Sequence, residues 1–345
     1  MIHGRRTTRL EPAWTKDAGD YVTTLGLAST GVVLAAGTAA GHLLLMEPWS
    51  GRELVRSVAH PGGLTSLAFA PAGDALATAG RDGHVRLWGL DGQPRGALGA
   101  GTYWLERIAW SPGGGTLAVA AGREVLLLEP DLTPRARSGP RPSTVSGLAW
   151  SQTPEQLWSS ELGGLRRWDP VTGAELSALA CPGSLLGVTV TRDASLLASP
   201  GQDTTVRIFR SGGGVGQTLQ GARAKPTALA WSADGRTLAH GGSESVLVWA
   251  FEPGTEEALT ASSRAEGRAL PFHQARVGAV AFAPDKDLLA TGAADGSLAV
   301  WSLAERDRRC GHAMLAAAPS QLLWAVEPRR LLAATASGQV LALEA

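Results

Sequence analysis

A stretch of thirteen residues recurs almost unchanged more than two hundred positions along the chain. Residues 76–88 read LATAGRDGHVRLW, and residues 289–301 read LATGAADGSLAVW. The last letter of this motif has eight related positions in the sequence, which are Met46, Trp88, Leu128, Trp168, Phe209, Trp249, Trp301 and Leu343. They are separated by 42, 40, 40, 41, 40, 52 and 42 residues. A period near 40 that is built from short strands and turns is typical of the blades of a β-propeller.

Each repeat unit carries the signals of three short strands. Segments such as LTSLAFAP and VGAVAFAPD give a first β-rich strand and a turn, LATAG gives a second strand, and HVRLW gives a third. In that third strand Val85 and Leu87 alternate with Arg86 and Trp88, which fits a sheet covered on both faces by its neighbours. The chain of 345 residues holds 44 Gly and 20 Pro, so turns are frequent and long helices are not expected. We therefore predict an all-β propeller formed as one domain by residues 1–345.

The spacing predicts eight four-stranded antiparallel blades. Their expected bounds are 15–58, 59–100, 101–140, 141–182, 183–221, 222–272, 273–312 and 313–345 plus 1–12. The last unit reaches the C-terminus after its third strand, so its outer strand must come from elsewhere. Residues 1–12 are the expected donor, because pairing the two ends of the chain closes the ring and removes a free sheet edge.

The best preserved units resemble the WD repeat. In that family a His before the first strand, a Ser or Thr on the second, an Asp in the next turn and a Trp on the third form a hydrogen-bonded set. Two units match at all four positions, with His60, Thr78, Asp82 and Trp88 in the second unit and His273, Thr291, Asp295 and Trp301 in the seventh. The resemblance covers essentially the whole chain and implies a structural role for these residues. Since seven blades are commoner in this family, a seven-bladed ring is the alternative to eight.

A catalytic function is a second interpretation of His60 and Asp82. We disfavour it because the same pair recurs as His273 and Asp295, and no Ser or Cys nucleophile motif accompanies either pair. The sequence also has no phosphate-binding Gly-Lys-Ser/Thr loop, no zinc-type His-Glu motif, no Gly-x-Ser-x-Gly elbow and no calcium loop. We therefore predict that the protein is not an enzyme and uses no cofactor and no metal.

The charge balance gives no reason to expect a polyanionic partner. Lys plus Arg and Asp plus Glu both total 31, so we predict neither nucleic acid nor membrane as a partner. The two cysteines, Cys181 and Cys310, fit no metal or redox spacing. The start MIHGRRTTRLEPAW has no apolar run, and we expect a cytoplasmic protein. The scarcity of Lys beside Arg suggests a GC-rich bacterial source.

The candidate contact residues lie in loops. In the WD-repeat family, the loops that enter the first strands and leave the second strands form one face around the channel, where peptide or protein partners usually bind. Trp, Tyr and Arg dominate interface hot spots. We therefore predict a partner-binding set on this face, consisting of Tyr21, Arg81, Tyr103, Trp104, Lys225 and Arg276. The alternative for Trp104 is that it fills the gap between two blades.

Two further segments have both a structural and a functional interpretation. Arginines are frequent in the outer strands expected for the last two blades, at Arg5, Arg6, Arg9, Arg306, Arg308 and Arg309, and in an adjoining turn at Arg329 and Arg330. They either bind an acidic partner or protect sheet edges from pairing. The 52-residue interval contains an insertion, residues 252–268, which is either a solvated loop or a partner contact.

These observations together predict a non-catalytic scaffold that binds a protein or peptide on the channel face. The mechanism is rigid display, since a closed ring holds loops from separate blades in fixed positions. The alternative is a propeller enzyme or small-molecule binder that uses the mouth of the channel.

Overall fold

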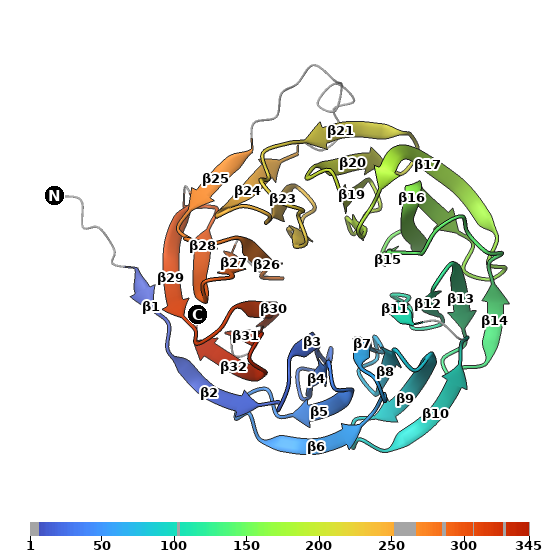
Figure 1. Cartoon of the computed structure of the whole chain (residues 1–345), viewed down its shortest axis with the longest axis horizontal. Coiled ribbons are helices and arrows are strands. Elements are labelled where there is room, and N and C mark those ends of the chain that lie inside the picture. The colour runs from blue at the N-terminus through green and yellow to red at the C-terminus, as the bar shows by residue number, and fades with distance from the viewer. Residues whose placement is uncertain are drawn as a thin grey trace.

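The structure is a computed structural model that describes residues 7–101, 104–251, 267–284, 288–305, 307–326 and 329–344. Its strands form eight sheets arranged as a ring around a central channel (Figure 1). Within the described ranges every regular element is a strand. The eight-bladed propeller expected from the repeat is confirmed, and a seven-bladed ring is not formed.

Each blade contains four strand positions from the channel outward. The first strands line the channel and are β3 (Val22–Leu27), β7 (Leu64–Phe69), β11 (Leu105–Trp110), β15 (Gly147–Ser151), β18 (Thr189–Val190), β22 (Leu229–Trp231), β26 (Val277–Phe282) and β30 (Pro319–Ala325). The second strands are β4 (Leu34–Thr38), β8 (Ala75–Gly80), β12 (Leu117–Ala121), the first part of β16 (Gln156–Trp168), β19 (Leu196–Pro200), β23 (Thr237–His240), β27 (Leu288–Ala293) and β31 (Arg330–Thr335).

The outer half of each blade is built in the same order. The third strands are β5 (His42–Met46), β9 (His84–Gly89), β13 (Glu124–Leu128), the last part of β16, β20 (Val206–Arg210), β24 (Ser245–Ala250), β28 (Ser297–Ser302) and β32 (Gln339–Glu344). The outer strands are β6 (Glu53–Val58), β10 (Pro94–Gly99), β14 (Pro134–Arg137), β17 (Glu175–Ser184), β21 (Val215–Leu219), β25 (Arg268–Pro271), β29 (Arg308–Met314) and β2 (Pro12–Asp17). Blade one is β3 to β6, and blade eight consists of β30, β31, β32 and β2.

Burial follows the position of a strand in its blade. Every residue of β4, β8 and β12 is buried, because neighbouring blades cover both faces of these strands. The outer strand β6 instead alternates between partly buried and exposed residues. The core is accordingly divided into eight apolar clusters, one at each seam between neighbouring blades.

The ring is closed by β2, which pairs antiparallel with β32 from Pro12 opposite Leu343 to Asp17 opposite Gln339. Closure by an N-terminal strand is thus confirmed, but the strand is Pro12–Asp17 and not residues 1–12. The closing strand lies further along the chain than expected because Trp14 and Lys16 face blade one, while the residues between and beside them are exposed. The Trp14 indole Nε1 donates to the carbonyl of Pro48 at 3.0 Å. Lys16 Nζ lies 3.0 Å from a carboxylate oxygen of Glu53.

A short strand, β1 (Thr8–Arg9), extends the closure to a second blade. It pairs in parallel with β29, the outer strand of blade seven. The next residue, Leu10, is 6% exposed and packs in the apolar cluster between blades seven and eight. A Cβ on Gly311 would approach the Leu10 side chain to 3.0 Å, so glycine at this position leaves room for it. The N-terminal segment therefore ties blades seven, eight and one together.

An inner belt of hydroxyl groups joins the first strands at four seams. Three side chains at bulges of these strands and Ser146, which precedes β15, donate to a carbonyl of the next blade. The bonds run from Ser320 to Val22 at 3.0 Å, from Thr23 to Leu64 at 2.6 Å, from Thr65 to Leu105 at 2.5 Å and from Ser146 to Leu185 at 2.8 Å. At the equivalent position of blade three the bulge residue is Glu106, which has no hydroxyl group. The belt therefore stiffens the channel wall at these four seams.

Indole groups at the other end of the first strands add bonds across three seams. Nε1 of Trp110 donates to Ala68 at 3.1 Å, Nε1 of Trp150 to Ala109 at 3.1 Å, and Nε1 of Trp324 to Ala281 at 3.0 Å. Trp231 of blade six is different, because its Nε1 is buried without a hydrogen-bond partner. Among the described residues, the seams between blades five and six and between blades six and seven have neither the belt bond nor the indole bond.

Deleting residues 1–17 tests the closure, because it removes β1 and β2 and leaves β32 unpaired. We expect the Tm to fall by roughly 5–10 °C, since several kcal/mol of packing is lost and each kcal/mol shifts the Tm by about 1–2 °C in a chain of 345 residues. Deleting residues 1–11 is the matched control, which removes β1 and Leu10 but keeps all of β2. It should lower the Tm clearly less in a calorimetric scan. Equal Tm values for both truncations would contradict a closing role for β2.

Candidate functional site

The candidate site is the channel face, which we define by the loops that enter the first strands and the loops that join second to third strands. The side chains of Tyr21, Trp104, Lys225 and Arg276 are exposed in loops of the first kind. Arg81 is exposed in a loop of the second kind, between β8 and β9. Tyr103 lies outside the described residues.

The structure brings two of the predicted contact residues together. The Arg81 guanidinium carbon lies 4.7 Å from the centre of the Trp104 ring, a cation–π distance. Arg81 belongs to blade two and Trp104 precedes the first strand of blade three, so the pair spans a seam. Trp104 is 55% exposed. Its ring therefore does not fill the gap between the blades but lies on the surface, covered on one side by Arg81.

The other predicted contact residues lie on separate blades. Tyr21 is 44% exposed between β2 and β3, Lys225 precedes β22 and Arg276 precedes β26. Among the described residues no hydrogen bond, ion pair or ring contact joins the side chains of Tyr21, Lys225 or Arg276 to one another or to Trp104. They frame the channel instead of forming a cluster.

The four-residue set expected in blade two is formed below this face. His60 is fully buried, with Nδ1 at 2.8 Å from Asp82 Oδ1 and Nε2 at 2.8 Å from Thr78 Oγ1. Trp88 Nε1 donates to the same threonine oxygen at 2.9 Å. With His60 Nδ1 donating to Asp82, the bonds run in one direction, from the indole through the hydroxyl and the imidazole to the carboxylate.

The electrostatics of this set favour a neutral His60 and an ionised Asp82. Burial lowers the pKa of His60, although the Asp82 carboxylate acts in the opposite direction. Burial alone would raise the pKa of Asp82, but its bonds with His60 and Arg86 hold that pKa below the usual value. Arg86 Nη1 donates to Asp82 Oδ2 at 2.6 Å, a contact that the sequence pattern did not reveal. Every polar atom of the set is used internally, which leaves none for substrate chemistry.

Blade seven forms a variant of the same set. His273 Nε2 lies 2.8 Å from Thr291 Oγ1, and Trp301 Nε1 donates to that oxygen at 3.0 Å. His273 does not contact Asp295 directly, contrary to the expected pattern. Ser297 stands between them, with Oγ at 2.6 Å from His273 Nδ1 and at 2.5 Å from Asp295 Oδ1. Because Ser297 lies between the two side chains, His273 has no direct hydrogen bond to a carboxylate that would raise its pKa. Burial therefore lowers the pKa of His273 to about 4.

Blade four forms a similar buried hydrogen-bonded set from other residues. Trp168 Nε1 donates to Ser159 Oγ at 2.8 Å, as Trp88 does to Thr78. Arg141 replaces the histidine, with its guanidinium 5.5 Å above the Trp168 ring and 2.9 Å from the buried carboxylate of Glu161. Arg141 precedes Ser159 by eighteen residues, as His60 precedes Thr78, and this spacing is the feature of the sequence that could have indicated the set in blade four.

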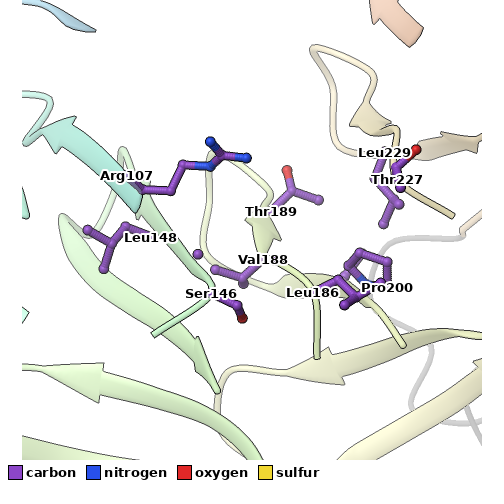
Figure 2. Close-up of a pocket in the computed structure, with 12 residues that line it drawn as sticks. Arg107, Ser146, Leu148, Leu186, Val188, Thr189, Pro200, Thr227 and Leu229 are labelled. Carbon is purple, nitrogen blue, oxygen red and sulfur yellow. The ribbon is translucent and has the colours of Figure 1, made fainter. Parts of the chain in front are cut away.

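A cavity opens in the channel wall between blades three and six. Its volume is about 170 Å³, and it is lined by Arg107, Ser146, Gly147, Leu148, Leu186, Gly187, Val188, Thr189, Ala198, Pro200, Thr227 and Leu229. Figure 2 shows Arg107 extending from β11 towards Thr189 of β18. Sequence reasoning missed this residue. The only feature of the sequence that could have pointed to Arg107 is its position: it is a cation in a first strand, directly after the bulge residue Glu106, where blade two has Ser66.

The arginine-rich sector is largely occupied by internal contacts. Arg9 pairs with Glu11 at 2.9 Å, Arg308 with Glu305 at 2.7 Å and Arg330 with Glu344 at 3.6 Å. The Arg309 guanidinium carbon lies 4.1 Å from the centre of the Phe272 ring. Arg5, Arg6 and Arg306, together with residues 252–266 of the expected insertion, lie outside the described residues. The described arginines therefore do not gather as an open cationic patch.

Among the residues that the structure describes, no three His, Cys, Asp or Glu side chains gather closely enough to hold a metal ion. In that part of the chain, no helix has the length and hydrophobicity needed to cross a bilayer.

Comparisons with known proteins agree with this architecture. The family described as WD domain, G-beta repeat, matches residues 52–89 and 266–302, the segments from β6 to β9 and from β25 to β28. Telomerase protein component 1 of Rattus norvegicus is 31% identical over 209 residues, which are 55% of this chain and 8% of that protein. WD repeat and SOCS box-containing protein 1 of Xenopus tropicalis is 32% identical over 104 residues, which are 29% of this chain and 25% of that protein.

The chain thus spans only a small part of the length of these relatives. The expected bacterial source gains no support from them, since both are vertebrate proteins. Among solved structures, the crystal structure of the computationally designed Ika8 protein has a TM-score of 0.79 and 19% identity, covering 96% of this chain and 98% of that one. This similarity concerns the fold alone.

The low pKa of His273 predicts a loss of stability in mild acid. An unfolded histidine has a pKa near 6.5, so as the pH falls from about 6.5 to about 4 the unfolded chain gains a proton that the folded blade resists. The free energy of unfolding should be highest above pH 6.5 and fall by up to about 1.4 kcal/mol per pH unit for this group. Urea titrations between pH 7.5 and 4.5 measure it. The variant His273→Gln should be less stable at pH 7.5 but should depend less on pH, and equal slopes would contradict the assignment.

Proposed function

Because the chain is an eight-bladed WD-repeat β-propeller, we propose that it acts as a non-catalytic scaffold that holds a protein or peptide partner on its channel face. The observation that carries this proposal is the exposed pair of Trp104 and Arg81. A large aromatic ring that stays at the surface while a guanidinium holds it in place is a preorganised contact. Such residues contribute most to protein–protein affinity and lose little entropy on binding.

Part of the exposed apolar surface lies on the same face, and large hydrophobic side chains are also exposed elsewhere, at Val32, Leu54, Val171, Leu176, Val215 and Val326. Among the described residues, large hydrophobic side chains are exposed at or beside its loops at Tyr21, Val58, Trp104, Leu162 and Met314. They are spread over several blades. A partner that touches them must lie across the face, which suits a folded protein or an extended peptide.

The relatives support a role in assemblies. One is by name a component of telomerase, and the other is by name a protein that combines WD repeats with a SOCS box. Both names are compatible with a propeller that contributes contacts to a larger protein or complex. We transfer only this general role to the present chain.

An enzyme or a small-molecule binder at the channel mouth is the second candidate. The cavity beside Arg107 is the observation that favours it. Its lining contains no His, Cys, Asp, Glu or Lys, so the hydroxyls of Ser146, Thr189 and Thr227 have no general base in the lining to activate them. The cavity therefore fits binding better than catalysis.

We further propose that the described blades act as one domain in the cytoplasm. The two cysteines are free, and Cys181 is buried in the seam between blades four and five. Burial raises the pKa of the Cys181 thiol, which keeps it protonated and unreactive at neutral pH. A reducing compartment suits such thiols.

Substituting Trp104 by Ala tests the scaffold proposal. Wild-type protein and the variant are used to capture partners from a lysate of the source organism, with bound proteins identified by mass spectrometry. We expect at least one specific partner to be retained by wild type and lost roughly tenfold or more by the variant, which corresponds to about 1.4 kcal/mol. Because Trp104 is 55% exposed, the Tm should stay within a few degrees.

Leu176→Ala is the matched control, since Leu176 is 52% exposed on the outer strand β17, away from the channel face. It should leave capture unchanged. A large fall in the Tm of Trp104→Ala would assign the ring to packing. Equal capture by all three proteins would move the binding site elsewhere.

A further inference from the structure

The cavity in the channel wall has the composition of a binding site for an acidic side chain. Arg107 is exposed, and its one hydrogen bond to a described residue is from Nη1 to the carbonyl of neighbouring Glu106 at 3.3 Å. Within the described residues it has no carboxylate partner. Most of its guanidinium donors are therefore free to bind an anion, and a carboxylate can accept two of them at once.

Hydroxyl and apolar groups complete the lining. Thr189 and Thr227 line the cavity, and their hydroxyls have no hydrogen bond to any described residue. Leu148, Leu186 and Leu229 contribute apolar surface. Figure 2 shows the leucines and threonines on several chain segments around the space that Arg107 enters. A ligand with a short aliphatic stem and a terminal carboxylate satisfies both kinds of surface.

The cavity occurs at the part of the ring where the first strands are shortest. β18 has two residues and β22 has three, whereas β7 and β11 have six each. The seam between β18 and β22 also lacks the inner belt bond and the indole bond among the described residues. Fewer paired residues leave space at the channel-face ends of these strands, where Leu186 and Thr227 precede them.

The size of the cavity indicates one side chain. A volume of about 170 Å³ corresponds to five or six water molecules at roughly 30 Å³ each. Pockets for cofactors and drug-sized ligands measure about 300–1,000 Å³. A glutamate side chain belongs to the smaller class, and the rest of its peptide would extend over the channel face.

The charges on the channel face favour an acidic partner. Five cations there have no carboxylate partner among the described residues: Arg81, Arg107, Arg123, Lys225 and Arg276. Three acidic side chains on the face, Asp20, Glu106 and Asp295, likewise lack an ion pair within the described residues, although Asp295 accepts hydrogen bonds from Ser297 and from the backbone of Gln274. Others are engaged, since Asp203 pairs with Arg207 and Glu244 with Arg223. The unpaired charges are thus mainly positive although the whole chain is neutral.

We propose that this cavity receives the carboxylate of a glutamate or aspartate in an acidic peptide segment of the partner, with Arg107 as its anchor. This proposal rests on the proposed scaffold function and names the chemistry of the partner. A nucleic acid is not favoured, because the apolar lining and the small volume suit a side chain and offer no aromatic surface for base stacking.

Fluorescence anisotropy with oriented peptide libraries tests the proposal on the full chain. Each fluorescein-labelled twelve-residue library has degenerate flanks and one central residue, which is Glu, Gln, phosphoserine or Arg. We expect the Glu library to bind at least tenfold more tightly than the Gln library, and to weaken when salt rises from about 0.05 to 0.3 M. Arg107→Gln should abolish the preference for Glu over Gln.

Two more variants separate the site from general charge and folding effects. Arg192→Gln removes an exposed cation from the turn between β18 and β19, at the opposite end of the strand, and should keep the preference. Leu148→Trp keeps every charge but fills the cavity, and should weaken the Glu library as strongly as Arg107→Gln does. Far-ultraviolet circular dichroism and the Tm of each variant confirm that it is folded.

Several outcomes would overturn the proposal. The first is equal binding of the Glu and Gln libraries, and the second is tighter binding of the phosphoserine library than of the Glu library. The third is tighter binding of a labelled oligouridylate than of any peptide library. The fourth is binding of isobutyrate in ligand-observed NMR when no peptide library binds. A captured partner that depends on Trp104 but not on Arg107 would also overturn it while leaving the scaffold function intact. Failure of both Trp104 and Arg107 to affect any partner would remove the scaffold function itself.

Discussion

The antiparallel pairing of β2 with β32 is the contact on which the other seven seams depend. Seven seams join blades that follow one another in the chain, whereas the seam between blades eight and one exists only when the ends of the ring meet. Its apolar cluster includes Leu34, Leu44 and Leu332, all fully buried. Opening this seam would expose those side chains to water and leave β32 as a free edge. The strand Pro12–Asp17 prevents both.

Charge pairing reinforces this closure on the side of blade one. Arg56 donates through Nη1 to the carbonyl of Ala18 and through Nη2 to that of Asp17, each at 2.9 Å. The same guanidinium and Lys16 lower the pKa of Glu53 to about 2, so the carboxylate stays charged throughout the physiological range. One strand is therefore part of the sheet of blade eight and is bonded by side chains to blade one. A ring closed in this way holds the loops of all blades in fixed relative positions.

The seams of the ring are not equivalent, and the difference bears on function. Where Ser, Thr or Trp occupies the right position of a first strand, hydrogen bonds join the channel wall to the next blade. At the seam between β18 and β22 these bonds are not formed among the described residues, since Trp231 Nε1 and the Thr227 hydroxyl have no partner there, and the wall contains a cavity. The buried sets under His60, His273 and Arg141 consume their polar groups internally. Binding groups are consequently found at the face and in the cavity, where polar atoms remain without internal partners.

The sequence alone predicts those features whose interactions lie within one repeat unit, and it does not predict those that depend on contacts between distant units. The period of about 40 residues determined the number of blades, and the spacing from His60 to Trp88 determined a local hydrogen-bonded set, because both arise within one unit. The exposure of Trp104 against Arg81, the serine between His273 and Asp295, and the unpaired Arg107 beside Thr189 were decided by the tertiary structure. The closing strand was likewise expected at residues 1–12 but lies at Pro12–Asp17. Alternation with a period of two marks a strand but not its partner, and only the closed ring determines which side chains from distant units meet.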